Sequence, residues 1–259
     1  MSSTPHAGAP KIRDRRWLDT LAAIAFIAVC ASYLWDRYGS DWPSQADAAP
    51  IEAAGSVPTP AGEPLPPDPV VVAGAPRLGS PEARAAMAVY SDFECPYCKR
   101  FADEVMPALQ RDYIDTGQLA LTFHHAPIEQ LHPNAVKAAV AAACAGEQGR
   151  FWPMHDALFS APRQLDEASL RQHAGQLGLD RPTFDTCLSG ETVEARVRAE
   201  RAVSQSLGVR GTPAFLFGTV EPDGRLRVTR RFSGALPIAN FREVLDELLA
   251  PLEPDNEQP

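Results

Sequence analysis

The sequence lacks several patterns that would place it in other classes of protein. Among its five cysteines, no second close pair joins Cys95 and Cys98 to complete a zinc site, and His155 and His173 have no histidine at ligand spacing. The formal net charge is −9, and no stripe of lysine and arginine interleaved with aromatic residues occurs, which argues against nucleic acid as a partner. We also find no internal repeat. We therefore predict no metal and no cofactor.

A pair of cysteines separated by two residues, Cys95 and Cys98, is the most informative feature that the sequence does have. A strand-like apolar run ends at Tyr90 and helical spacing begins at Lys99, so the pair lies where a strand gives way to a helix. Free N–H groups at the start of a helix stabilise a thiolate at the first sulfur. The second sulfur, one turn on, can attack a mixed disulfide formed by the first. The pattern predicts a reversible dithiol centre in which Cys95 is the reactive, solvent-accessible thiol.

The N-terminal part has the pattern of a membrane anchor. Four basic residues precede an apolar run from Trp17 to Trp35, which as a helix spans roughly 28 Å. The charges predict residues 1–16 in the cytoplasm, a transmembrane segment over 17–35, and the rest of the chain outside. A cleaved signal peptide is the alternative, but Ala46-Asp47-Ala48 lies too far past the run for a cleavage site. We therefore predict a single-pass inner-membrane protein whose catalytic part faces the periplasm, where disulfides persist.

Residues 36–76 are rich in proline and alanine and have no sustained apolar period, so we expect a disordered linker there. Within this segment, Val70-Val71-Val72 is either a short strand or an apolar patch, and the sequence does not decide between them. The folded domain is predicted over 77–250, and a flexible tail over 251–259.

The order of predicted elements within the folded domain indicates an α/β fold. Strand patterns occur at 87–90, 119–123, 213–217 and 226–230, and a terminal helix pattern occurs at 241–249. Several short helices, broken at glycines and prolines, form an insertion over about 130–207. This is the order of a thioredoxin fold with an inserted α-helical domain, preceded here by one transmembrane helix and a Pro/Ala-rich tether.

Several motifs occur in an order that is typical of one enzyme family. They are Leu78-Gly79-Ser80-Pro81, Tyr90-Ser91-Asp92-Phe93-Glu94-Cys95-Pro96-Tyr97-Cys98, His132-Pro133-Asn134-Ala135, Cys144 to Trp152, Leu177-Gly178-Leu179-Asp180 and Gly208 to Pro213. On these motifs the chain resembles the DsbA-like thiol–disulfide oxidoreductases. The resemblance implies that Cys95 is the nucleophile and Cys98 its resolving partner. Pro96 and Tyr97 lie between the sulfurs, so we expect them to tune the redox potential.

The resemblance also implies a role for the segment around Thr212 and Pro213. Pro213 matches a proline that is cis in this fold and faces the dithiol. Thr212 would offer its backbone to an incoming peptide strand, and its hydroxyl would lie beside the sulfurs. One departure concerns Val89, because many relatives have a buried acid at this position, six residues before the first cysteine. Neither Asp92 nor Glu94 is an established replacement, so the proton transfer at Cys98 is left open.

The other exported cysteines are Cys144 and Cys187. The even number of cysteines beyond the anchor and the exported compartment favour a structural disulfide between them, and two buried free thiols are the alternative. His124 and His125 resemble a family position, and we expect His124 to serve packing or to lie at the surface rather than to contact the thiolate.

The predicted function is disulfide exchange with exported proteins through the Cys95/Cys98 pair, in the oxidising direction. Partners would be exported proteins with thiols or disulfides and a membrane electron-transfer partner, with the membrane itself contacted through residues 17–35. The alternatives are a disulfide reductase or isomerase, or a non-catalytic chaperone that uses the same sulfurs to bind a metal or a peptide. Stoichiometric metal binding without substrate oxidation would favour that last class.

Overall fold

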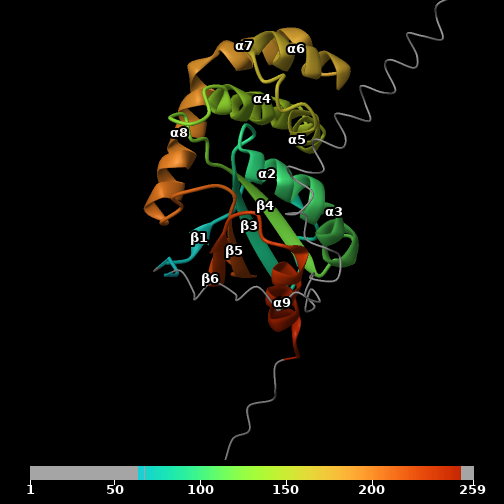
Figure 1. Cartoon of the computed structure of the whole chain (residues 1–259), viewed down its shortest axis with the longest axis vertical. Coiled ribbons are helices and arrows are strands. Elements are labelled where there is room, and N and C mark those ends of the chain that lie inside the picture. Colours follow the sequence, from blue (N-terminus) through green and yellow to red (C-terminus); the bar gives the residue numbers. More distant parts are fainter. Residues whose placement is uncertain (1–63, 67, 252–259) are drawn as a thin grey trace, which may run out of the picture. The chain divides into compact units, whose positions relative to one another are not determined.

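The structure is a computed structural model that describes residues 64–66 and 68–251. The predicted cytoplasmic tail, the transmembrane anchor, residues 36–63 of the linker and residues 252–259 of the tail lie outside the described residues (Figure 1). Over the described ranges, no helix combines the length and apolar character needed to cross a membrane.

A six-stranded sheet in the order β1-β6-β5-β3-β4-β2 forms the centre of the fold (Figure 1). Its strands are β1 Val70–Val71, β2 Arg77–Leu78, β3 Ala85–Ser91, β4 Leu119–His125, β5 Ala214–Val220 and β6 Arg225–Ser233. β3 and β4 run parallel, and the other neighbouring pairs of this sheet are antiparallel. A parallel pair needs a crossover connection, which the helical segment after the dithiol supplies. The four predicted strands are all present.

Helices cover the sheet and form the predicted insertion. They are α2 Pro96–Arg100, α3 Met106–Leu109, α4 Ala135–Glu147, α5 Phe151–Ser160, α6 Glu167–Gln176, α7 Arg181–Ser189, α8 Glu191–Ser206 and α9 Ile238–Leu249. A π-helical segment, η1 Phe101–Val105, joins α2 to α3, and a second, η2 Gln110–Ile114, continues the same helical run after α3. Helices α4 to α8 follow β4 in the chain; α4 to α7 gather beyond one end of the sheet, and α8 runs from there down beside the sheet (Figure 1).

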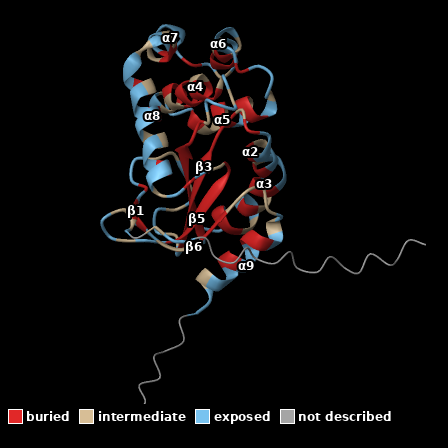
Figure 2. Cartoon of the chain, turned by 60° about the vertical axis from the view of Figure 1, so that its left-hand side comes forward, coloured by how far each residue is buried: buried red, intermediate tan, exposed pale blue. Residues whose placement is uncertain are grey.

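The alternation of side chains along β3 decides which groups face the dithiol. All of β3 is buried, because it lies in the middle of the sheet with helices or loops on both faces (Figure 2). Met87 and Val89 pack into the cluster that also holds Cys95 and Cys98. Ala86, Ala88 and Tyr90 pack into a second cluster on the opposite face. The odd-numbered residues of β3 therefore face the helix that carries the sulfurs.

The folded part begins earlier than the predicted boundary at Arg77. Val70–Val71 is a strand that pairs with β6, with Val70 opposite Leu226. The guanidinium of Arg231 on β6 donates to the backbone carbonyl of Pro64 at 3.1 Å. The prediction of a disordered linker up to residue 76 is therefore wrong at its C-terminal end. A strand of two residues is too short to show the period by which strands are recognised in a sequence.

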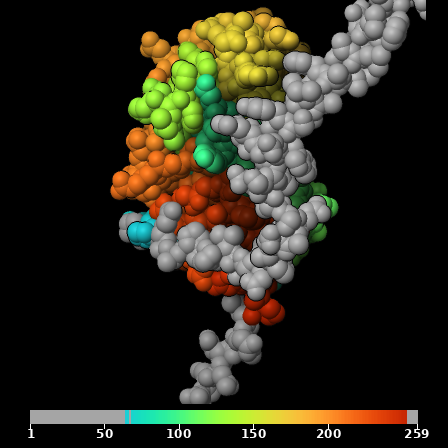
Figure 3. Space-filling model, in the orientation of Figure 1, coloured from blue at the N-terminus to red at the C-terminus, as the bar shows by residue number. Residues whose placement is uncertain are grey.

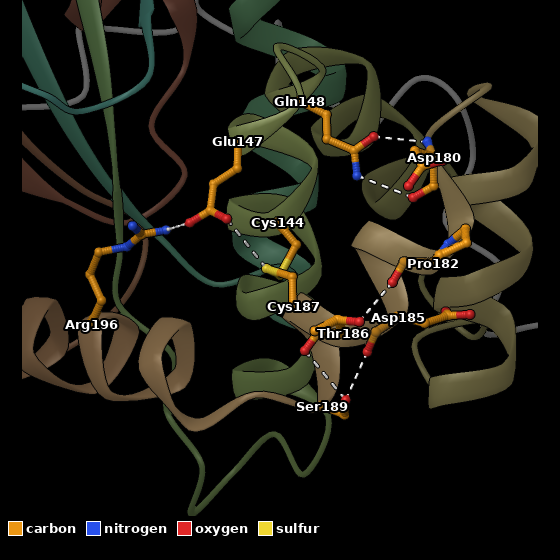
Figure 4. Close-up of a disulfide and its surroundings, with 10 residues drawn as sticks. All are labelled: Cys144, Glu147, Gln148, Asp180, Pro182, Asp185, Thr186, Cys187, Ser189 and Arg196. Carbon is orange, nitrogen blue, oxygen red and sulfur yellow. Dashed lines mark hydrogen bonds and ion pairs between the residues drawn. A yellow bond between two sulfur atoms is a disulfide. The ribbon is translucent and has the colours of Figure 1, made fainter.

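A disulfide between Cys144 and Cys187 fastens α4 to α7 within the insertion (Figure 4). The two Cα atoms are 5.8 Å apart, and Cys144 is buried. The carboxylate of Glu147 lies beside Cys187 and forms an ion pair with Arg196 of α8 at 3.0 Å. The bridge and the ion pair thus hold three helices of the insertion together.

Candidate active site

The two sulfurs of the motif stand at the start of α2. Cys95 is the N-cap residue of this helix and Pro96 is its first residue, a position where proline loses no hydrogen bond. Cys98 lies one turn on and is fully buried. Cys95 is only 4% exposed, so the expectation of a readily solvent-accessible thiol is wrong for this thiol form of the protein. The reason is that the loop before Pro213 packs against the sulfur.

The surroundings of Cys95 lower the pKa of its thiol from 9.0 to about 6. The largest contribution is a hydrogen bond from the Cys98 thiol, and burial opposes it. The Thr212 side chain and the backbone N–H groups of Cys98 and Tyr97 lower the pKa of Cys95 further. Donors at the first turn of a helix therefore stabilise the Cys95 thiolate, as the motif predicts.

The surroundings of Cys98 have the opposite effect. Burial, followed by the hydrogen bond and the charge of Cys95, raises the pKa of the Cys98 thiol. Two groups partly oppose this increase. The backbone N–H of Asp92 donates to the Cys98 sulfur at 3.4 Å, and the Ser91 side chain also lowers the pKa of Cys98. At neutral pH the reduced pair therefore consists of a Cys95 thiolate and a Cys98 thiol.

The loop before β5 supplies the other side of the site. The Thr212–Pro213 peptide bond is cis. The Cys95 thiol donates to the Thr212 carbonyl at 3.4 Å, which brings residues 117 positions apart into contact. The hydroxyl of Thr212 is buried and makes no hydrogen bond in the described structure, so it is available to donate to the thiolate. The predicted substrate-binding residues Thr212 and Pro213 are thus brought together with the dithiol.

Two acids of the active-site loop fasten it to the segment before α4. The buried carboxylate of Asp92 accepts from the backbone N–H of Ile128 and from His132 Nδ1, both at 2.8 Å. Glu94 accepts from the backbone and side-chain nitrogens of Asn134 at 2.6 and 3.0 Å. In Figure 3 the surface of α2 lies beside the segment near residue 130 and the segment after residue 210. Sequence reasoning missed this positioning role, although the motif around His132 and Asn134 was its signal.

The residues between the sulfurs differ in how they reach Cys95. The side chain of Tyr97 is 59% exposed, whereas its backbone N–H contributes to the low pKa of Cys95. Pro96 has no N–H to donate and begins the helix. Any effect of Tyr97 on the thiolate of the isolated protein therefore comes from its amide rather than from its ring.

His124 and His125 serve the packing of β4 rather than the dithiol. His124 is buried, stacks on Tyr90 with ring centroids 4.9 Å apart, and pairs with Glu200 of α8 at 3.3 Å. His125 lies among aromatic side chains, and burial lowers its pKa to about 4, so it is neutral. No cluster of three or more histidine, cysteine or acidic side chains that could hold a metal occurs within residues 64–66 and 68–251.

Comparison with known proteins places this site in a family. A redox-capable Cys-Pro-Tyr-Cys pair opposite a cis proline defines a class of dithiol exchange proteins. Residues 72–230 match the sequence model of a family described as Thioredoxin. The chain therefore belongs to the thioredoxin family, and the predicted thioredoxin-like α/β fold is confirmed.

Solved structures share the fold of the described part. The chain is similar to alpha-DsbA1 of Wolbachia pipientis, with a TM-score of 0.61 and 22% identity over 69% of this chain and 92% of the other. It is similar to oxidised BdbD of Bacillus subtilis, with a TM-score of 0.60 and 21% identity over 71% of this chain and 100% of the other. A thioredoxin-like oxidoreductase of Silicibacter pomeroyi is 26% identical over 69% of this chain and 94% of the other, with a TM-score of 0.55.

Curated relatives match a smaller part of their own length. The Na(+)/H(+) antiporter NhaA 3 of Salinispora tropica is 36% identical over 137 residues, which are 53% of this chain and 20% of that protein. The antiporter NhaA of Herminiimonas arsenicoxydans is 33% identical over 137 residues, 53% of this chain and 21% of that protein. This chain thus spans about a fifth of these relatives, and ion transport is a property stated for those proteins.

Proposed function

We propose that the protein oxidises thiols of exported proteins, passing its Cys95–Cys98 disulfide to them. The observation that carries this proposal is the low pKa of Cys95, about 6. A stabilised thiolate exists only in the reduced enzyme, so it favours the reduced form and makes the disulfide a stronger oxidant.

The size of this effect follows from the pKa. At pH 7, a thiol of pKa about 6 is roughly 90% ionised, whereas an ordinary one is almost wholly protonated. This difference stabilises the reduced form by about 1.4 kcal/mol, which corresponds to about 30 mV for a two-electron couple. The effect grows as the pH rises towards 9 and disappears as the pH falls through 6.

The exchange steps follow from the unequal thiols. A client thiolate attacks Cys95 Sγ of the disulfide, and the sulfur–sulfur bond breaks with its electron pair on Cys98. A second client thiolate attacks the client sulfur of this mixed disulfide, and Cys95 leaves as a thiolate. The client gains a disulfide and loses two electrons, which the enzyme takes up. The low pKa of Cys95 makes it a good leaving group in the second step.

The experiment that tests the direction uses the full-length protein in its oxidised and reduced forms. We expect the oxidised form to introduce a disulfide into a reduced peptide faster than the reduced form breaks the disulfides of insulin. Faster insulin reduction would make the protein a reductase. Metal bound at one ion per dithiol, with neither reaction, would point instead to a metal chaperone.

We further propose that residues 17–35 hold the protein in the inner membrane with its dithiol in the periplasm. The apolar run and the basic residues before it support this location. Anchoring would raise the effective concentration of the dithiol near emerging clients and near a membrane electron-transfer partner. A chain that begins at residue 58 should keep dithiol exchange in solution and lose activity in cells. Recovery of the full-length protein in the soluble fraction after lysis would contradict the anchor.

A further inference from the structure

The resolving sulfur, Cys98, becomes a thiolate during exchange, although its surroundings disfavour a negative charge. It is fully buried, and its pKa is raised. On the β3 face towards it, Val89 contributes an apolar side chain that is 2% exposed. The carboxylate of Asp92 is engaged with Ile128 and His132, so it is not free to act on Cys98. Another group must therefore stabilise the negative charge of the Cys98 thiolate.

Ser91 is placed to do so. It is the last residue of β3 and is 3% exposed. Because side chains alternate along a strand, Ser91 lies on the same face as Val89, which packs in the cluster with Cys98. The next backbone N–H, that of Asp92, already reaches the Cys98 sulfur at 3.4 Å, and the Ser91 side chain is among the groups that lower the pKa of Cys98. A hydroxyl can donate one hydrogen bond to a thiolate without itself ionising.

We propose that the Ser91 hydroxyl, together with the Asp92 amide, holds the Cys98 thiolate during disulfide exchange. When a client thiolate attacks Cys95, the Cys95–Cys98 bond breaks and its electron pair leaves with Cys98. The two donors receive this charge, and Cys98 then takes a proton from solvent. In the reverse direction, Cys98 returns that proton to solvent, and its thiolate attacks Cys95 Sγ of a mixed disulfide and expels the client thiolate. Ser91 is thus a catalytic residue in either direction.

This inference rests on the proposed exchange through Cys95 and Cys98. The two steps of the reaction distinguish a failure of that exchange from a failure of the role of Ser91. Reduced full-length protein is mixed with glutathione disulfide, and samples are quenched in acid and weighed by mass spectrometry. In the first step Cys95 forms a mixed disulfide and releases one glutathione. In the second step Cys98 closes the disulfide and releases the other. Ser91 should affect the second step only.

The sharpest comparison is between Ser91→Thr and Ser91→Val, which have the same shape and differ in the hydroxyl. Loss of one hydrogen bond to a charged group lowers the thiolate fraction of Cys98 about tenfold. A thiolate of higher pKa is also more nucleophilic, which restores about threefold of the rate. At pH 7 closure should therefore be about threefold slower in Ser91→Val than in Ser91→Thr, with the first step changed less than about twofold.

Ser204→Ala, which removes another fully buried serine hydroxyl, is the matched control and should leave both steps unchanged. If the branched variants do not fold, Ser91→Ala is compared with the natural protein, since it adds no atoms. Equal closure rates with and without the hydroxyl would overturn the role of Ser91 while leaving exchange intact. A natural protein that forms the mixed disulfide and never closes it would overturn the proposed exchange and this inference together.

Discussion

Replacing Thr212 by valine removes a buried hydroxyl from the residue whose backbone carbonyl contacts the Cys95 sulfur. The hydroxyl makes no hydrogen bond in the described residues, yet it is among the groups that lower the pKa of Cys95. Its donation therefore matters once Cys95 is ionised. Valine keeps the shape of threonine and removes the donor, so the substitution isolates this one interaction.

The expected shift follows from the strength of such a bond. A hydrogen bond to a charged group contributes about 1.5 kcal/mol at the lower end of its range, which is about one pKa unit. The pKa of Cys95 should therefore rise from about 6 to about 7 in Thr212→Val. The reduced protein gains stability from the Cys95 thiolate as the pH rises from 6 towards 9 and loses it as the pH falls through 6, and the lower limit of this window should move up by about one unit.

The assay is the rate of alkylation of Cys95 by iodoacetamide as a function of pH, with the alkylated cysteine identified by mass spectrometry. The midpoint should move up by about one unit, and the plateau at high pH should rise about threefold, because a more basic thiolate is more nucleophilic. Thr122→Val, which removes a buried hydroxyl bonded to His124, is the control and should leave the midpoint in place. An unmoved midpoint in Thr212→Val would refute the assignment of a donor role to this hydroxyl.

Two further predictions concern the other cysteines. Cys98→Ser should accumulate mixed disulfides between Cys95 and clients in cells, because the resolving attack is lost. Non-reducing gels would reveal these mixed disulfides, and their absence would count against the exchange mechanism. Replacing both Cys144 and Cys187 by alanine should lower the free energy of unfolding by about 4 kcal/mol, the value of the chain-entropy model for a loop of this length. Urea denaturation measures this change, and a loss below about 1 kcal/mol would show that the bridge contributes little.

The strands and the dithiol were predictable because their signals are local. β3 and β4 are apolar runs bounded by turns, and a cysteine pair at a strand-to-helix junction needs no distant residue to be recognised. The insertion was predictable for the same reason, since glycines and prolines mark the ends of its helices. These parts of the fold depend on patterns within a short window of the sequence.

What the sequence did not reveal depends on contacts between distant segments. Asp92 and Glu94 are bound by groups that lie 36 to 40 residues further along the chain, so their positioning role becomes visible only after folding. The burial of Cys95 likewise depends on Thr212, which is 117 residues away. Ser91 is inconspicuous in the sequence, and the direction of its side chain is decided by the pleat of β3 and by the position of α2.

The redox potential of the Cys95–Cys98 pair as a function of pH, measured by equilibrium with glutathione, shows whether a stabilised Cys95 thiolate makes the disulfide an oxidant. Below pH 6 the reduction takes up two protons, and the potential should fall by about 59 mV per pH unit. Above pH 6 Cys95 remains a thiolate and one proton is taken up, so the slope should fall to about 30 mV per unit. We expect this break near pH 6 and a potential less negative than the roughly −270 mV of thioredoxin. An unbroken slope of about 59 mV up to pH 8, with a potential at or below that of thioredoxin, would contradict it.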